Sequence, residues 1–267
     1  HVTEHSFPTR RSSDLDKTGE IVFDKVSFRY PDAEEDVLKD ISFTAGKGET
    51  VALIGATGCG KSTVINLIPR FYDATEGTVS VDGVNVKDYS QKELRNKIGY
   101  VSQKATLFTG TIESNVAYGD NGQKNASETD IKKALDIAQA SEFVDSLEDG
   151  SKAYVAQGGS NFSGGQKQRM SIARAIARKP EILIFDDSFS ALDYKTDRVL
   201  REALAKSCKD STRIIVAQRI GTIRDADRII VLEDGKIAGM GRHEELMRDC
   251  EVYRQIALSQ LSKEELA

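Results

Sequence analysis

Residues 50–68 read TVALIGATGCGKSTVINLI and indicate the fold class more clearly than any other segment of the chain. Its apolar run TVALIG predicts a buried strand, because no regular polar alternation marks a solvent-facing side. Residues 61–71 place apolar side chains at helical spacing and have Pro69 near their end, which predicts a helix. A buried strand, a glycine-rich turn and a helix in this order indicate an α/β domain with a largely parallel sheet.

The glycine-rich turn fits a phosphate-binding pattern. Residues 55–62 read GATGCGKS and match G-x-x-x-x-G-K-[ST] at every fixed position. The glycines allow a tight turn whose amide N–H groups point at an anion, and the following helix adds the positive end of its dipole. Lys61 can reach the β- and γ-phosphates, and the Ser62 hydroxyl can bind Mg²⁺. The predicted ATP-binding residues of this loop are Gly55, Ala56, Thr57, Gly58, Cys59, Gly60, Lys61, Ser62 and Thr63.

A second buried strand ends in two carboxylates. Residues 182–188 read ILIFDDS, so four apolar residues lead directly into Asp186 and Asp187. A phosphate-binding loop of this kind is normally paired with an acid at the end of another buried strand. We therefore predict that Asp186 orients Mg²⁺ through a bound water, together with Ser62.

The rest of the chain completes an α/β pattern. Residues 21–30 and 37–46 predict an antiparallel pair, and residues 77–86 predict a short β segment around an Asp-Gly turn. Strands at 98–101, 182–185 and 213–217 alternate with helical segments, a hairpin follows around Asp234-Gly235, and helices end the chain. The sequence predicts a P-loop NTPase core of RecA-like type with a mainly parallel sheet, an N-terminal antiparallel β subdomain and an inserted α-helical subdomain.

Composition excludes several classes of protein. The 267 residues are 39% hydrophobic and 30% charged, and the net charge of -5 without blocks of like charge gives no sign of a nucleic-acid partner. No apolar run approaches the roughly 18 residues that cross a bilayer, so we expect the chain to be soluble when produced alone. Three cysteines without a CxxC pair are typical of free thiols in a reducing compartment.

Both chain ends are expected to lie outside the folded domain. Residues 1–15 read HVTEHSFPTRRSSDL, begin with His rather than Met and have neither helical nor strand periodicity. They resemble a translated sequencing adapter, and a natural disordered linker is the alternative. We therefore assign residues 1–18 and 262–267 to tails.

Residues 161–169 narrow the choice among P-loop proteins. They read NFSGGQKQR and resemble the signature sequence of ATP-binding-cassette (ABC) ATPases. Ser163 can cap the following helix, and the two glycines leave backbone amides exposed at its positive end. In this family the signature of one subunit closes over the γ-phosphate held by the P-loop of the other. The resemblance therefore implies a head-to-tail dimer with two ATP molecules, bound in part by Ser163, Gly164, Gly165 and Gln166.

Other landmarks of the family follow in order, and the resemblance covers residues 19–261, with a helical subdomain at about 105–179. Tyr30 matches the aromatic residue that stacks on adenine. Gln103 matches the glutamine that contacts Mg²⁺ and the lytic water and links to the membrane domain. Asp193, in the sequence SALD, matches the loop that crosses to the partner subunit and its nucleotide.

Residues 67–86 and 106–119 resemble ABC exporters in particular. In such proteins a six-helix membrane domain precedes the ATPase on the same chain, so the resemblance implies that this chain is a C-terminal half and works at the cytoplasmic face of the inner membrane. Ala156 replaces an acid that the family often has before its signature. That substitution puts one coupling contact to the partner in doubt.

Two positions depart from the family's pattern for a hydrolysing site. The family usually has Glu where Asp187 stands, and an aspartate carboxylate falls short by about 1–1.5 Å, a displacement that can cost about 100-fold in rate. The family usually has His where Gln218 stands, and glutamine can donate a hydrogen bond but cannot take up a proton. The predicted catalytic residues are Asp187, Gln218 and Gln103.

These departures favour one of three interpretations. They resemble the subunit of a heterodimeric exporter whose own site binds ATP and hydrolyses it slowly, while its intact signature completes the site of a different partner chain. The second interpretation is a fully competent subunit of a homodimeric exporter. The third is a soluble ABC ATPase without a transport role, against which stands the exporter-like sequence of residues 111–119.

Overall fold

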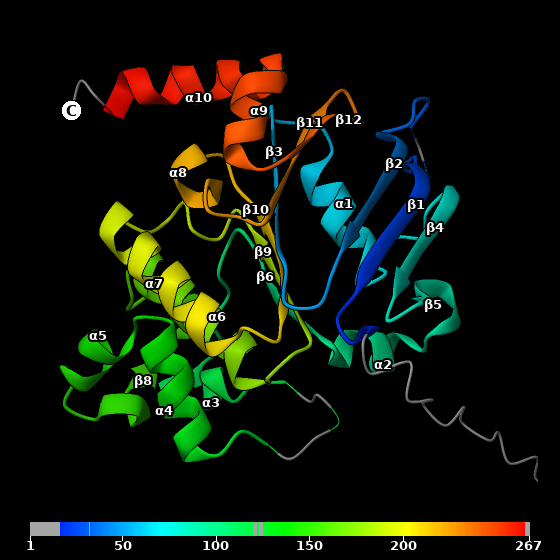
Figure 1. Cartoon of the computed structure of the whole chain (residues 1–267). Helices are drawn as coiled ribbons and strands as arrows, with labels where there is room; N and C mark the ends of the chain where they lie inside the picture. The colour runs from blue at the N-terminus through cyan, green and yellow to red at the C-terminus, as the bar shows by residue number, and fades with distance from the viewer. Residues whose placement is uncertain (1–16, 32, 120–121, 123–124, 265–267) are drawn as a thin grey trace, which may run out of the picture.

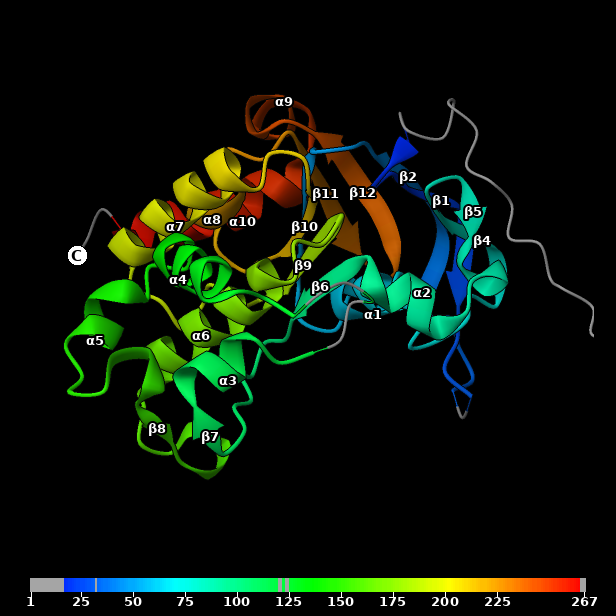
Figure 2. The ribbon, with the colours of Figure 1, turned by 90° about the horizontal axis from the view of Figure 1, so that it is seen from below.

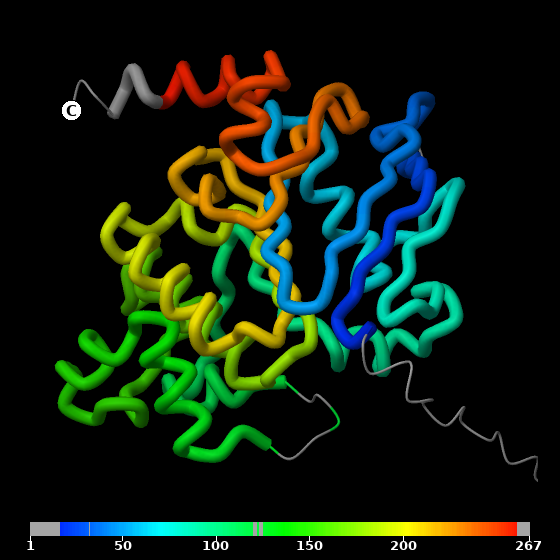
Figure 3. The backbone as a smooth tube through the Cα atoms, viewed as in Figure 1, coloured from blue at the N-terminus to red at the C-terminus, as the bar shows by residue number. Residues whose placement is uncertain are grey.

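The computed structural model of the chain describes residues 17–31, 33–119, 122 and 125–264, with side chains to residue 260 (Figure 1). Of the predicted tails, residues 1–16 and 265–267 lie outside the described residues, whereas residues 262–264 are the last residues of the C-terminal helix. Figure 3 traces the backbone from the antiparallel strands at the N-terminal side, through the central sheet and the helical region, to the last helix.

A central sheet holds the strands that the apolar runs predict. Within the described residues it has six strands in the order β12-β11-β3-β10-β9-β6, and all are parallel except β12, which runs antiparallel to β11. Their bounds are β3 (Thr50–Gly55), β6 (Ile98–Val101), β9 (Ile182–Asp186), β10 (Thr212–Val216), β11 (Arg228–Glu233) and β12 (Lys236–Gly241). The predicted hairpin around Asp234-Gly235 is the β11–β12 connection.

A second, antiparallel sheet has the order β2-β1-β4-β5. It is built from β1 (Ile21–Phe28), β2 (Leu38–Ala45), β4 (Glu76–Val81) and β5 (Val84–Asn85). The predicted N-terminal pair is confirmed, and β4 adds to it beside β1. The Asp82-Gly83 turn links β4 to β5, as the Asp-Gly pair predicts.

Helices α3 to α7 gather on one side of the central sheet, and the antiparallel sheet lies on the other (Figures 1 and 2). The helices are α1 (Lys61–Leu67), α2 (Gln91–Asn96), α3 (Ile112–Val116), α4 (Glu128–Ile137), α5 (Ser141–Asp145), α6 (Gly164–Ala177), α7 (Tyr194–Ser207), α8 (Ile220–Ile223), α9 (His243–Asp249) and α10 (Glu251–Glu264). A short antiparallel pair is formed by β7 (Gly110–Thr111) and β8 (Tyr154–Val155). The 3₁₀ turns are η2 (Val86–Asp88), η3 (Gly150–Lys152) and η4 (Gln157–Gly159).

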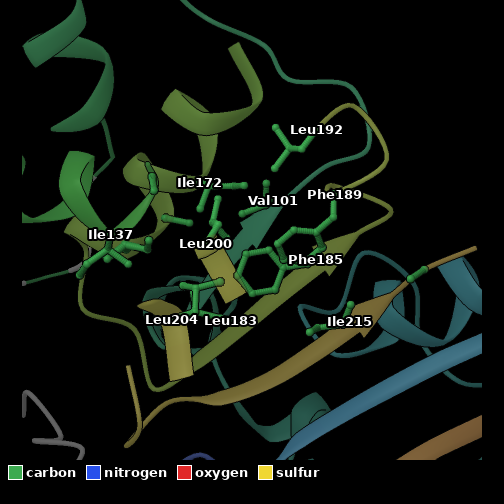
Figure 4. Close-up of a cluster of buried hydrophobic side chains, with 14 of the residues drawn as sticks. Val101, Ile137, Ile172, Leu183, Phe185, Phe189, Leu192, Leu200, Leu204 and Ile215 are labelled. Atoms are coloured by element: carbon green, nitrogen blue, oxygen red, sulfur yellow. The ribbon is translucent and has the colours of Figure 1, made fainter. Parts of the chain in front are cut away.

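The central sheet separates two hydrophobic cores. Successive side chains of a strand point to opposite faces, so β9 divides its residues between them. Ile182 and Ile184 pack toward the antiparallel sheet and α1, whereas Leu183 and Phe185 pack toward the helices. Figure 4 shows Phe185 beside Phe189 in the helical core. Burial of both faces explains the unbroken apolar runs, and it leaves polar residues to the carboxyl ends of the strands.

One prediction of local structure needs correction. The helix expected over residues 61–71 ends at Leu67, because Pro69 has no N–H to continue the hydrogen-bond series and Arg70 adopts the left-handed region with φ at 55°. The region from about 105 to 179, predicted as a helical subdomain, contains α3 to α6 together with the β7–β8 pair and turns. Ser127 starts α4 with a capping box, in which Asp130 N donates to Ser127 Oγ. The subdomain boundaries stay a prediction.

Candidate functional site

The glycine-rich loop forms an open cradle between β3 and α1. Gly55, Gly58 and Gly60 have φ values of 155°, 85° and 102°, in the region that side chains disfavour. A Cβ atom on Gly55 would lie 2.1 Å from the carbonyl oxygen of Leu232, so only glycine fits there. The loop residues 55–59 line a cavity of about 870 Å³. Lys61 Nζ donates to the carbonyl oxygens of Gly55 and Ala56, both at 2.8 Å.

Asp186 ends β9 beside the start of α1. Ser62 Oγ donates to Asp186 Oδ1 at 3.0 Å, which brings together the two residues that the sequence assigns to Mg²⁺. A hydroxyl and one carboxylate suit this ion, which is usually held by one or two carboxylates together with phosphate oxygens. No cluster of three His, Cys, Asp or Glu residues that could hold a metal occurs in the described part of the chain.

Tyr100 is a neighbour of Asp186 that the sequence did not identify. Its hydroxyl lies 3.2 Å from Asp186 Oδ2 and 3.0 Å from Asn66 Oδ1. Burial, followed by the nearby negative charge of Asp186, raises the pKa of the Tyr100 hydroxyl, so it stays protonated as a donor. In the sequence, Tyr100 is marked only by its position in the strand at 98–101, which precedes Gln103.

Asp187 is the meeting point of the predicted catalytic residues. Its carboxylate oxygen Oδ2 accepts a hydrogen bond from Gln103 Nε2 at 3.1 Å and another from Gln218 Nε2 at 2.8 Å. The side chain is nearly enclosed, with 8% of the residue exposed. The family resemblance implies that Gln103 contacts Mg²⁺ and the lytic water, and in this structure its amide donates to Asp187.

Burial raises the pKa of the Asp187 carboxyl above its ordinary value, although the amides of Gln103 and Gln218 oppose the shift by favouring the charged form. The Asp187 carboxyl therefore differs from an ordinary exposed acid in its pKa, in addition to its shorter reach compared with glutamate. The backbone of Asp187 is also unusual, with φ at 46°, and its N–H donates to the carbonyl oxygen of Val216 at 3.0 Å. Asparagine and aspartate tolerate this left-handed region better than most residues.

The signature residues form the start of α6. Ser163 Oγ accepts from Gln166 N at 3.2 Å, and Gln166 Oε1 accepts from Ser163 N at 2.9 Å, which is the expected capping box. Gly164 and Gly165 follow inside the first turn, and a Cβ atom on Gly165 would lie 3.3 Å from the Ala191 carbonyl oxygen. No hydrogen bond described for residues 163–166 reaches the cradle of the same chain.

Two further predicted residues lie at the edges of the site. Asp193 caps α7, and the hydrogen bond from Thr196 N at 2.9 Å is the main reason that its pKa is lowered. Tyr30 places its hydroxyl 3.1 Å from Thr63 Oγ1 at the start of α1. Its ring contacts Phe28 edge-on, with centroids 4.8 Å apart, so the ring is held beside the cradle.

The fold and the site together define a P-loop nucleotide-binding domain. The profile of the ABC transporter family matches residues 38–190. An uncharacterised ABC transporter ATP-binding protein of Mycobacterium tuberculosis is 46% identical over 243 residues, which cover 91% of this chain and 41% of that protein. A Staphylococcus aureus protein provisionally named a multidrug export ATP-binding/permease protein is 45% identical, over 90% of this chain and 41% of that protein.

A solved structure agrees with these relatives. A bacterial Atm1-family ABC exporter with ATP bound superposes with a TM-score of 0.86 at 36% identity, covering 92% of this chain and 43% of that one. The chain thus belongs to the ABC transporter family, as an ATP-binding domain of exporter type. It spans about two fifths of the length of these relatives, and none of the helices in its described part is long and apolar enough to cross a membrane.

Proposed function

We propose that this chain binds ATP with Mg²⁺ in the cradle of residues 55–63 and drives export as the ATP-binding domain of a membrane transporter. The cradle, the Ser62–Asp186 pair and the similarity to exporters support this proposal. Ser62 and Asp186 would hold the ion, whose positive charge offsets the negative charge of the phosphates. The transporter's membrane domain would place this chain at the cytoplasmic face of the inner membrane.

The proposal includes a second ABC domain. The capped start of α6 exposes backbone amides at the positive end of a helix, a feature suited to a phosphate group. Because residues 163–166 make no described hydrogen bond to the cradle of their own chain, we assign them to the nucleotide of a neighbouring subunit. We infer a head-to-tail arrangement in which Asp193 also faces the neighbour.

We further propose that the chain's own site holds ATP and hydrolyses it slowly, while a different partner chain supplies the faster site. The observation that carries this proposal is that Asp187 Oδ2 accepts both the Gln103 and the Gln218 amides. A water polarised by Asp187 must compete with these two amides for the carboxylate oxygen. The Asp187 side chain is also one methylene shorter than that of glutamate. Neither glutamine can take up the proton that such a water releases.

Single-turnover hydrolysis tests the slow site. With the chain in excess over ATP, we expect Asp187→Glu combined with Gln218→His to raise the rate by about tenfold to 100-fold, because reach and a titratable helper are restored together. Phosphate release is measured over time at saturating Mg²⁺. The competent homodimer remains the alternative, and wild-type turnover comparable to that of the double variant would establish it instead.

Two controls make the result specific. Lys61→Ala in the same double variant should remove the gain, because hydrolysis by a contaminant would not depend on the cradle. Nucleotide affinity of the wild type and the double variant should agree within about twofold, since neither position belongs to the glycine-rich loop. A gain caused by tighter binding alone would contradict the assignment of residues 187 and 218 to the chemical step.

A further inference from the structure

A glutamine of the C-terminal helix contacts the segment that carries Gln218. The Gln260 side chain uses both ends of its amide, because Nε2 donates to the Gln218 carbonyl oxygen at 2.6 Å and Oε1 accepts from Ile220 N at 2.7 Å. A single side chain therefore satisfies one acceptor before residue 219 and one donor after it. A neighbouring strand would make the same pair of contacts through its backbone.

This segment lacks regular structure of its own. Strand β10 ends at Val216, and α8, which begins at Ile220, has only four residues. The first N–H groups of a helix have no partner within the helix, and the N–H of Ile220 is one of them. Gln260 supplies that partner and thereby fixes the backbone on both sides of Arg219.

The side chains of the same segment reach two parts of the site. Gln218 donates to Asp187, as described above. Arg219 donates to the carbonyl oxygens of Ser190 and Leu192 at 3.3 and 3.4 Å, and its guanidinium lies 5.0 Å from the centre of the Tyr194 ring. Gln218 and Arg219 are adjacent in the chain. The backbone position that Gln260 sets therefore determines whether both side chains reach their hydrogen-bond partners.

Helix α10 is anchored well enough to serve as a support. Tyr253 and Ala257 are fully buried in the helical core, and Gln260 follows on the same side of the helix. The Tyr253 hydroxyl lies 2.7 Å from His243 Nδ1, which ties α10 to α9. In Figure 1, α10 runs above α8 and the ends of β3 and β11, in agreement with the contacts between these elements.

We propose that Gln260 is a positioning residue for the Asp187 site, which acts by holding the backbone around Arg219. Its described hydrogen bonds go to the backbone of Gln218 and Ile220, although the side chain lines the same cavity as residues 55–59. The proposal rests on the proposed function in one respect: Asp187 and Gln218 act on bound ATP. Loss of the two Gln260 hydrogen bonds would release the backbone that aims the Gln218 amide at Asp187.

The test uses the 267-residue chain with Gln260→Ala, Gln260→Glu and Leu258→Ala. Gln260→Ala removes both hydrogen bonds, so we expect hydrogen exchange at the Ile220 amide to accelerate about three- to tenfold and single-turnover hydrolysis to fall by a similar factor. The dissociation constant for ATP should stay within about twofold. Gln260→Glu keeps the acceptor for Ile220 and loses the donor to Gln218, so its hydrolysis should also fall while exchange at Ile220 stays slow.

Leu258→Ala is the matched control, because this side chain is 55% exposed on the same helix and the change removes no described hydrogen bond. It should leave both readouts unchanged. Wild-type hydrolysis in Gln260→Ala, despite faster exchange at Ile220, would overturn the proposal. Wild-type hydrolysis in Gln260→Glu would overturn the role of the bond to Gln218.

A double-mutant cycle separates positioning from general destabilisation. In a Gln218→Ala background, Gln260→Ala should lose most of its effect on hydrolysis, because the side chain that it positions is gone. An undiminished effect in that background would overturn the proposal. The slow-site proposal and the Gln260 proposal fail on different results. Rapid hydrolysis by the wild type would refute the slow site. The effect of the Gln260 substitutions on hydrolysis could still be measured, both in that chain and in the Asp187→Glu, Gln218→His chain.

Discussion

The cradle of residues 55–63 and the Asp187 cluster lie at the same edge of the central sheet, but they are built differently. The cradle is one continuous segment, and its geometry depends on backbone conformations such as that of Gly55. The Asp187 cluster brings together side chains from three distant segments, at positions 103, 187 and 218. A contiguous backbone site tolerates changes elsewhere in the chain, whereas a site of converging side chains depends on the length and placement of each one.

The largest expected effect is on the cradle. Lys61→Ala should weaken ATP binding by about 100-fold or more, because it removes a charge-assisted contact to the phosphates. Titration with a fluorescent ATP analogue measures the affinity, and Lys132→Ala, at an exposed position of α4, is the control. Affinity unchanged by Lys61→Ala would show that the cradle is not the nucleotide site, and the contrast with the Asp187 cluster would then disappear.

A smaller effect is expected at the signature. Ser163→Ala removes the N-cap of α6 and should lower the free energy of unfolding by about 1 kcal/mol, measured by urea denaturation. ATP affinity of the same chain should not change, because the signature makes no described contact with its own cradle. A loss of affinity as large as that of Lys61→Ala would place the signature in the chain's own site.

The smallest effect concerns the pH dependence of stability. A carboxyl whose folded-state pKa is raised contributes stability that is present below its unfolded pKa of about 3.9 and lost as pH rises through the folded value. Burial raises the pKa of Asp187, so the wild type should lose stability in that window. Asp187→Asn should not show this loss, and its advantage in thermal unfolding should grow from pH 4 upward and then stay constant. An advantage that shrinks as pH rises would contradict the direction of the shift.

The sequence predicted the fold well where local and tertiary requirements agree. The runs TVALIG and ILIF are apolar throughout, and both became central strands buried on two faces. The Ser163 cap and the Asp234-Gly235 turn also gave correct boundaries. The helix after the cradle was predicted too long, because the missing N–H of Pro69 and the left-handed backbone of Arg70 end it early.

The candidate site was predicted in part, for a physical reason. The members of the cradle are adjacent in the chain, so their spacing alone identified them. The sequence also named Gln103, Gln218 and Asp187, but not that both amides meet at a single oxygen, since that depends on the relative placement of three strands. Tyr100 and Gln260 could not be identified, because a tyrosine in a strand and a glutamine in a helix have no distinguishing pattern.

The left-handed backbone of Asp187 has a consequence for how this position can evolve. Aspartate is among the residues that adopt such a conformation most easily, and glutamate has no comparable local advantage. A change to glutamate would therefore exchange some folding stability for catalytic reach. Under selection for thermal tolerance alone, libraries randomised at position 187 should keep aspartate, asparagine or glycine. Under selection for turnover, glutamate should appear together with stabilising changes elsewhere.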